Sequence, residues 1–211
     1  MRIGVLGTGA MTVALGGRLA EAGHQVVVGS RDPERAFEVA RAIGAARGAG
    51  YREAARAEVV IVAVADWVAL EVVESLADEL RGAVLIDLGN PIDPPHFESR
   101  YGSGPSLAER MSEAAPGARV VKAFNTVYAE HLTGPIATAA GRDPVPVLVA
   151  SDDEEATGVV VDLVRQVGGE PRRVGGLRVA RHLERLAGFE VDLVERGFAR
   201  ATAVRVVDLP G

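Results

Sequence analysis

The stretch MRIGVLGTGAM, residues 1–11, decides the fold expected for this chain. Residues 3–6 form a short apolar run typical of a buried strand, and Gly7 and Gly9 follow it before a segment with helical character. The next apolar run begins near Gln25, so strand, glycine-rich turn, helix and strand follow one another within a short βαβ unit. In this context a GxGxx pattern indicates a dinucleotide-binding turn.

Each residue of the turn has a physical role in that interpretation. Gly7 would make the sharp bend, and Gly9, which lacks a Cβ, would let a pyrophosphate approach the backbone N–H groups at the helix N-terminus. Thr12 departs from the pattern, because a glycine or alanine usually stands there. The alternative is a turn that joins strand to helix without a ligand. The residues expected to contact the phosphates are Gly7, Thr8, Gly9, Ala10 and Met11.

Short apolar runs alternate with segments of helical periodicity along most of the chain. Runs that are apolar throughout are typical of parallel strands covered by helices on both faces. We therefore expect an α/β fold with a doubly wound, Rossmann-type, mostly parallel sheet and a C-terminal helix. The expected strands are 3–6, 25–28, 59–64, 83–88, 119–123, 145–149 and 172–174, and the expected helices are 10–22, 33–43, 67–80, 153–167 and 177–198. Residues 90–105, with four prolines and two glycines, are expected to form a loop over the strand ends.

The end of the second expected strand indicates which dinucleotide would bind. No Asp or Glu stands at its tip to accept hydrogen bonds from a ribose with free hydroxyls, whereas Ser30, Arg31 and Arg35 could surround a 2′-phosphate. Asp32 is the competing ribose ligand, but it directly precedes Pro33, an order typical of a helix N-cap followed by proline. We expect NADP(H) rather than NAD(H); the alternative is a solvated surface pair of arginines.

Ligands of open α/β sheets lie outside the carboxyl ends of the strands. The residues that follow the strands at 59–64, 83–88 and 119–123 should therefore face the nicotinamide ring. They include Ala65, Asp66, Trp67, Asn90, Pro91, Phe124 and Asn125. Asp66 also stands where the N-cap of the following helix would be.

Two charged residues are expected inside the sheet. Asp87 and Lys122 each precede an asparagine by three residues on strands that should be adjacent and parallel. We predict that they form a buried ion pair with a structural role, since a lone buried charge is costly.

The composition excludes several classes of partner. With 23 basic and 29 acidic residues the net charge is −6, which gives no electrostatic reason to bind nucleic acid or an anionic membrane. Without cysteine there is no disulfide, thiolate metal site or thiol nucleophile, and no spacing of histidines with carboxylates indicates a metal site. Neither a signal peptide nor an apolar segment of membrane-spanning length is evident, so a cytoplasmic protein is expected.

Several motifs together resemble those of a known family. They are GVLGTGAM at 4–11, VVVGSRDPER at 26–35, Trp67, IDLGNP at 86–91, VVKAFNT at 120–126 and GGLRVARHLERL at 175–186. With these motifs the chain resembles the coenzyme F420-dependent NADP oxidoreductases, whose Rossmann-type domain also occurs in metalloreductases. The resemblance implies that the phosphates of NADP are held by Thr8, Ser30, Arg31 and Arg35 and that the nicotinamide site is lined by Asn90, Pro91, Phe124 and Asn125. It also implies coenzyme F420, or a flavin, as the hydride acceptor.

Two departures from the family bear on the acceptor. Asp66 replaces a proline, and the chain after Phe198 does not resemble the glycine-rich, apolar tail that covers the deazaflavin in the family. A flavin or deazaflavin acceptor needs little from side chains, whereas an imine or ketone needs a proton source. The candidate acids are Asp66, Tyr128 and His131.

The expected function is therefore hydride transfer between NADP(H) and F420 or a flavin-like acceptor. The alternatives are direct reduction of a small C=N, C=O or activated C=C group, and a dinucleotide-binding regulator without turnover.

The chain divides into an NADP-binding domain at 1–175 and a C-terminal helical segment at 176–211. The last helix has apolar residues on more than one side. It could pack on its own sheet; the preferred alternative is a homodimer in which it helps to close the acceptor site.

Overall fold

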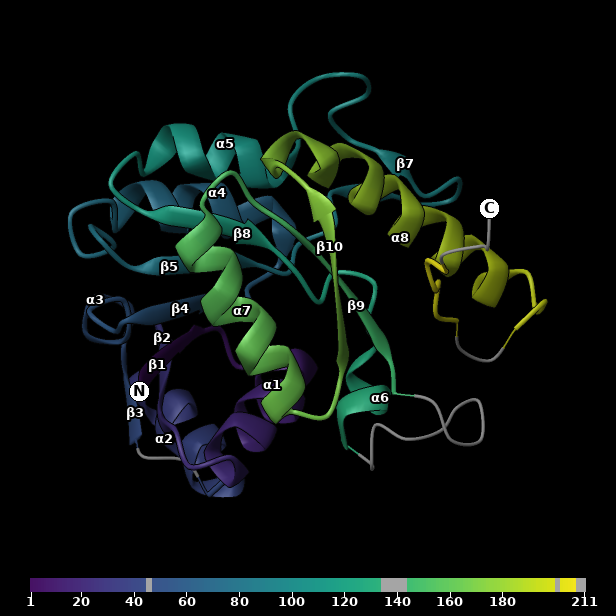
Figure 1. Cartoon of the computed structure of the whole chain (residues 1–211). Coiled ribbons are helices and arrows are strands. Elements are labelled where there is room, and N and C mark those ends of the chain that lie inside the picture. Colours follow the sequence, from purple (N-terminus) through teal and green to yellow (C-terminus); the bar gives the residue numbers. More distant parts are fainter. Residues whose placement is uncertain (45–46, 134–143, 200–201, 208–211) are drawn as a thin grey trace.

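The computed structural model describes residues 1–44, 47–133, 144–199 and 202–207. The main strands are β1 (Arg2–Leu6), β2 (Gln25–Ser30), β3 (Arg47–Gly50), β4 (Val59–Val62), β5 (Val84–Asp87), β8 (Arg119–Lys122), β9 (Pro146–Ala150) and β10 (Glu170–Gly175). Within the described residues they form one eight-stranded sheet in the order β10-β9-β8-β5-β4-β1-β2-β3 (Figure 1). Neighbouring strands run parallel except β8 and β9. The expected doubly wound, mostly parallel sheet is confirmed.

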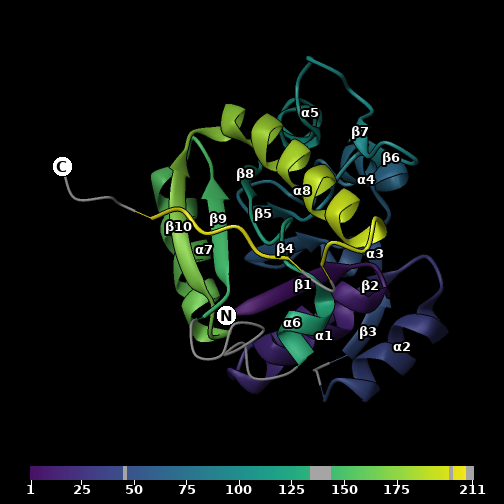
Figure 2. The ribbon, with the colours of Figure 1, turned by 90° about the vertical axis from the view of Figure 1, so that its right-hand side faces the viewer.

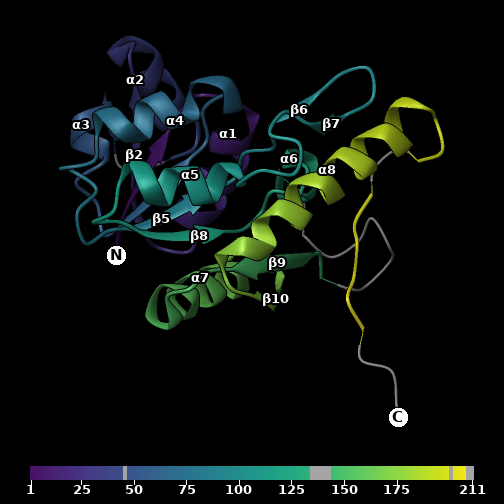
Figure 3. The same ribbon diagram turned by 90° about the horizontal axis from the view of Figure 1, so that it is seen from above.

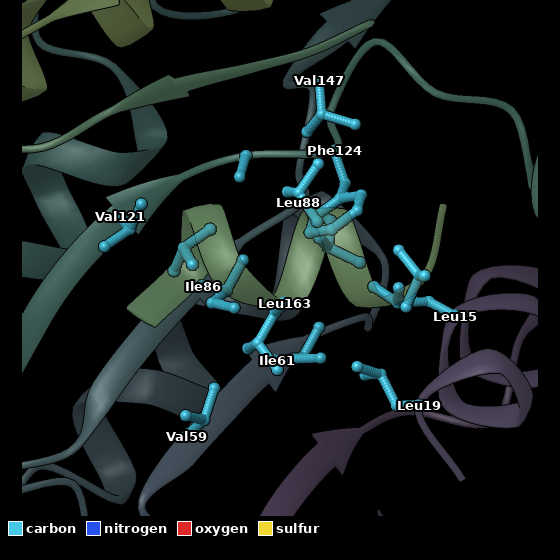
Figure 4. Close-up of a cluster of buried hydrophobic side chains, with 14 of the residues drawn as sticks. Leu15, Leu19, Val59, Ile61, Ile86, Leu88, Val121, Phe124, Val147 and Leu163 are labelled. Atoms are coloured by element: carbon cyan, nitrogen blue, oxygen red, sulfur yellow. The ribbon is translucent and has the colours of Figure 1, made fainter. Parts of the chain in front are cut away.

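Helices cover both faces of the sheet, as its fully apolar strands require. The helices are α1 (Ala10–Glu21), α2 (Pro33–Ala42), α3 (Tyr51–Ala54), α4 (Asp66–Ser75), α5 (Leu107–Ala114), α6 (Ala129–Thr133), α7 (Glu154–Gln166) and α8 (Ala180–Glu195). On one face α1, α6 and α7 enclose a cluster that includes Leu15, Ile61 and Leu163 (Figure 4). On the other face α3, α4 and α5 pack around residues such as Val73 and Met111.

Side chains near the helix ends explain several boundaries. Asp32 caps α2 by accepting hydrogen bonds from the backbone N–H groups of Glu34 and Arg35 at 3.0 and 3.2 Å, so its expected role is confirmed. Ser106 and Glu109 form a capping box at the start of α5, a helix that the periodicity analysis did not predict.

Three expectations about elements are wrong in detail, and two short elements were missed. Residues 90–105 are not only loop, because β6 (Ile92–Asp93) and β7 (Glu98–Ser99) form a small antiparallel hairpin there. The helix expected at 67–80 ends at Ser75. Neither β3 nor α3 was predicted, since both are short and rich in glycine or alanine. The helix expected at 177–198 is a 3₁₀ turn (Leu177–Val179) followed by α8.

The last helix joins the body through its first half and extends past the sheet with its second half (Figures 2 and 3). Ala180, Leu183 and Ala187 are buried, whereas Phe189 is 56% exposed. The boundary drawn at residues 175 and 176 falls between β10 and this helix, and the separate status of the two parts stays a prediction. No helix among the described residues has both the length and the apolar character needed to cross a membrane.

Candidate active site

The carboxyl ends of β1, β2 and β4 surround a cavity of about 580 Å³. This is where doubly wound folds bind their ligands, because the strand tips and helix N-termini converge there. Of the residues predicted for cofactor binding, the cavity is lined by Gly7, Thr8, Gly9, Ser30, Arg31, Arg35, Ala65 and Trp67. Ala10 and Met11 are the first residues of α1, directly after the turn, and they do not line the cavity. Tyr51 also lines the cavity, although the sequence analysis did not predict it.

The two glycines of the turn are required for different reasons. Gly7 has φ of +126°, and a Cβ there would lie 2.3 Å from the carbonyl oxygen of Ala63, so the fold itself demands glycine. A Cβ on Gly9 would meet no protein atom within 4 Å. The space outside Gly9 faces the N-terminus of α1, which is the geometry of a pyrophosphate cradle. The turn therefore fits the expected dinucleotide.

The far end of this cavity carries the two predicted arginines. Asp32 also lines the cavity, and its Oδ1 accepts the two cap hydrogen bonds from α2. Arg35 is bonded to the exposed Glu38 at 3.2 Å, and Arg31 lies exposed at the tip of β2. A solvent-accessible ion pair contributes little to the stability of the fold. Arg35 can therefore exchange Glu38 for a phosphate group. This corner fits a 2′-phosphate.

Asp66 does not have the local role that the sequence indicated. Ala65 is the N-cap of α4, and Asp66 is the first residue inside the helix. Its Oδ2 accepts a hydrogen bond from Nη1 of Arg100 at 2.7 Å. Arg100 also binds Asp93 of the hairpin, and these hydrogen bonds, the one to Asp93 foremost, raise the pKa of Arg100. Asp66 thus anchors the hairpin to α4, and nothing in the structure tests its predicted role as an acid.

The tips of β5 and β8 are joined by two asparagines. Asn90 Nδ2 donates to the backbone oxygen of Asn125 at 2.6 Å, and Asn125 Nδ2 donates to Asn90 Oδ1 at 2.9 Å. Asn125 Nδ2 also donates to the carbonyl of Leu183 on α8 at 2.9 Å. Phe124, with φ of +59°, holds the left-handed conformation that turns Asn125 toward its partners. Pro91 is buried directly after Asn90.

Below these tips lies a buried cluster of three charges. Lys122 Nζ is 2.7 Å from Asp87 Oδ2 and 3.1 Å from Glu184 Oε1, and all three side chains are at most 1% exposed. Asp87 and Lys122 are register partners on β5 and β8, so the predicted buried ion pair is confirmed. The cluster also accepts backbone hydrogen bonds from Gly89 to Asp87 (2.7 Å) and from Leu107 to Glu184 (2.9 Å). Burial raises the pKa of Glu184, and Lys122 opposes that shift.

A second, smaller cavity of about 130 Å³ lies between the asparagine pair and α8. Besides Asn90 and Asn125 it is lined by Tyr128 and Glu190. Glu190 is 1% exposed, its Oε1 has no hydrogen-bond partner among the described residues, and burial raises its pKa to about 7. Tyr128 stacks edge-on with His131, the ring centroids being 5.5 Å apart. Of the three predicted acids, Tyr128 therefore lines this cavity, His131 packs against Tyr128 without lining it, and Asp66 lies elsewhere.

Glu184 and Glu190 were missed by the sequence analysis. Both are buried on α8 with Leu183 and Ala187, at the three- and four-residue spacing of one helix face. An acidic residue at core spacing is the signal that could have identified them. The sequence analysis noted only that this helix has apolar residues on more than one side.

No cluster of three or more possible metal ligands occurs within residues 1–44, 47–133, 144–199 and 202–207. The polar groups of both cavities are amides, hydroxyls, guanidinium groups and carboxyls, which suit organic ligands and phosphate.

Comparison with known proteins gives consistent relatives. A family model described as NADP oxidoreductase, coenzyme F420-dependent, matches residues 2–91. The F420-dependent NADP reductase of Methanothermobacter marburgensis is 33% identical over 231 aligned residues, covering 100% of both chains. Metalloreductase STEAP3 of Rattus norvegicus is 33% identical, over 87% of this chain and 36% of its own. The solved structure of a candidate F420-dependent NADP reductase from Arthrobacter sp. FB24 has a TM-score of 0.87 at 26% identity, covering 98% of this chain and 99% of that one.

The charge cluster gives a stability prediction. Asp87→Ala should lower the free energy of unfolding by about 3–5 kcal/mol, because it leaves Lys122 with an incomplete set of buried partners. Calorimetric NADPH affinity of the folded fraction should change much less. Urea denaturation checks the first value, with Asp78→Ala, at a surface ion pair whose carboxylate side chain is 92% exposed, as the control. A variant with the wild-type melting temperature would contradict the structural role.

Proposed function

Because this chain belongs to the family of F420-dependent NADP reductases and is thus an NADP-dependent oxidoreductase, we propose that it transfers a hydride between NADP(H) and coenzyme F420. The coenzyme would be bound along the carboxyl ends of the strands, and the acceptor beside α8. Because the members of this family are oxidoreductases, we discard the alternative of a dinucleotide-binding regulator without turnover.

The observation that carries the choice of NADP(H) is the corner formed by Ser30, Arg31 and Arg35. It holds two guanidinium groups; of the carboxylates beside them, Asp32 caps the start of α2 through Oδ1 and Glu38 is the exposed partner of Arg35. Guanidinium groups bind phosphate through charge-assisted, forked hydrogen bonds. From this corner the cavity leads past Gly9 toward Ala65 and Trp67.

The nicotinamide ring would then lie at the tips of β4, β5 and β8. NADP(H) supplies the reactive C–H bond when bound, and the chain contributes position and exclusion of water. Asn90, Pro91, Phe124 and Asn125 are proposed to line this end, where their mutual hydrogen bonds and the contact with Leu183 keep the surface rigid. A fixed surface keeps the donor and acceptor carbons at reacting distance.

The acceptor side is proposed to be completed by a second copy of the chain. Phe189 on α8 and Phe198 after it are 56% and 76% exposed, at the end of the helix that extends past the sheet (Figure 3). Exposed aromatic residues grouped at one end of a molecule are typical of an interface.

One observation favours a second candidate function. Glu190 provides a buried carboxyl group at the second cavity, and reduction of a small C=N or C=O group needs a proton source of this kind. The two candidates differ in the acceptor alone and share the whole NADP(H) site.

The central test mixes the protein with NADPH and F420 and follows the absorbance of both cofactors. We expect stoichiometric oxidation of NADPH and reduction of F420, and the reverse with reduced F420 and NADP⁺. Parallel reactions contain FMN, a cyclic imine or a ketone in place of F420. Turnover with the imine alone would select the second candidate, and absence of turnover with every acceptor would contradict both.

The phosphate corner gives a prediction on cofactor choice. Arg31→Ala and Arg35→Ala should each weaken NADPH binding about tenfold, because a hydrogen bond to a charged group contributes about 1.5 kcal/mol. NADH binding should change little, since NADH lacks the 2′-phosphate. Isothermal titration measures both affinities, with Arg41→Ala, exposed in the last turn of the same helix, as the control. Unchanged NADPH affinity in the double variant would refute the assignment of this corner.

The homodimer is tested by the mass in solution. Light scattering should give twice the 22.0 kDa mass of the chain, and Phe189→Glu should shift the protein toward the monomer, because a buried charge opposes association. Phe37→Glu, at a residue 61% exposed on α2, is the control and should stay dimeric. A wild-type mass of 22.0 kDa across the concentration range would rule the dimer out.

A further inference from the structure

Glu190 is an acidic residue in a buried position where an apolar side chain would be expected. It lies on the buried face of α8 and is 1% exposed, yet no cation or backbone N–H group of the described residues satisfies its Oε1. An unpaired buried carboxyl group destabilises the fold, above all when it is ionised. The neighbouring Glu184, at a similar depth on the same helix, does have a cation, Lys122.

The surroundings of Glu190 hold further unsatisfied polar groups. Both ring nitrogens of His131 are buried without hydrogen-bond partners among the described residues, and the hydroxyl of Tyr128 is buried beside that of Thr202. Tyr128 and Glu190 share the wall of the 130 Å³ cavity, whose other end is formed by Asn90 and Asn125. A polar cavity of this size suits the edge of a heteroaromatic ring or a few water molecules. A buried carboxyl group without a partner on the wall of a cavity, as Glu190 has, indicates a polar occupant.

The titratable groups near Glu190 come from three places. Tyr128 and His131 lie before and within α6, and Glu195 follows Glu190 on α8, where it is exposed. Burial raises the pKa of Tyr128, the Thr202 hydroxyl opposes that shift, and the negative charges of Glu190 and Glu195 add to it. For Glu190 itself burial is the cause of the raised pKa, about 7, so the carboxyl group gains or loses its proton near neutral pH.

We propose that Glu190 is the proton donor and acceptor for the hydride acceptor, which it would touch through the second cavity. This inference rests on the proposed function, in which the acceptor lies against α8. In the forward direction the C–H bond of NADPH breaks, the acceptor carbon gains the hydride, and a ring or imine nitrogen of the acceptor takes the proton from Glu190. The Glu190 carboxylate then regains a proton from water, so the balance is NADPH + acceptor + H⁺ → NADP⁺ + reduced acceptor. In reverse, the carboxylate removes that proton.

The two directions should therefore have opposite pH profiles. Reduction of the acceptor requires protonated Glu190, so its single-turnover rate should fall as pH rises through about 7. Reduction of NADP⁺ requires the carboxylate and should become faster over the same range.

The test compares Glu190→Gln with wild type in stopped-flow single turnovers with NADPH and F420 from pH 5.5 to 9. The glutamine keeps the shape of the side chain without a proton to transfer, so we expect a rate on the order of 100-fold lower and no dependence on pH near 7. Glu190→Asp should restore part of the rate. Asp162→Asn, which removes an exposed carboxylate from α7 where Asp162 pairs with Arg165, is the control and should keep the wild-type profile, including any titration of F420 itself.

Two readouts do not depend on turnover. Carbon NMR of ¹³C-labelled glutamate should show one carboxyl that titrates near pH 7 in wild type and is lost in Glu190→Gln. Because the folded pKa of Glu190 lies above the unfolded value of 4.5, the unfolded state loses this proton first, and the free energy of unfolding falls as pH rises from about 4.5 to 7. The melting temperature of wild type should thus fall more between pH 5 and pH 8 than that of Glu190→Gln.

The outcomes separate this inference from the proposed function. An active wild type whose rate and pH profile are shared by Glu190→Gln overturns the role of Glu190 and leaves the proposed function standing. A carboxyl that titrates near its ordinary value overturns it as well, even if Glu190→Gln folds too poorly for kinetics. A wild type that binds NADPH but reduces none of the acceptors contradicts the proposed function, and this inference with it.

Discussion

The buried ammonium group of Lys122 is the interaction on which the arrangement of the active site depends. It lies inside the sheet between Asp87 of the neighbouring strand and Glu184 of α8. Losing either carboxylate would leave an incompletely compensated charge in a medium of low dielectric, which costs several kcal/mol. The cluster therefore couples three elements that are far apart in the chain, and it does so directly below the strand tips that carry Asn90 and Asn125.

This coupling explains how one helix serves both the fold and the site. Glu184 and Leu183 fix the first half of α8 to the strand tips, through the charge cluster and through the hydrogen bond from Asn125. Close approach fixes the middle of the helix, since a Cβ at Gly188 would lie 2.2 Å from the carbonyl oxygen of Phe97 in the hairpin segment. With the helix held at these points, Glu190 stays buried. The contacts of the rest of α8 stabilise the fold by more than the desolvation of Glu190 destabilises it.

The cofactor and acceptor ends of the site differ in construction. At the cofactor end, a glycine turn and a helix N-terminus offer backbone N–H groups, and exposed arginines supply charge. These features lie within the first 35 residues and follow from local geometry. At the acceptor end, residues from β5, β8, the segment before α6 and the last helix meet around a small cavity. Such a site depends on how distant elements pack, so it can change while the cofactor end stays the same.

The sequence by itself determined the mostly parallel sheet, the cap at Asp32 and the pairing of Asp87 with Lys122. Each of these follows from spacing within one element or between adjacent parallel strands. Only the tertiary structure decided that Arg100 binds Asp66, that Glu184 completes the charge cluster and that Glu190 faces Tyr128 across a cavity. Those contacts join residues 34 to 62 positions apart, and no local periodicity encodes which distant element will pack against which face of a helix.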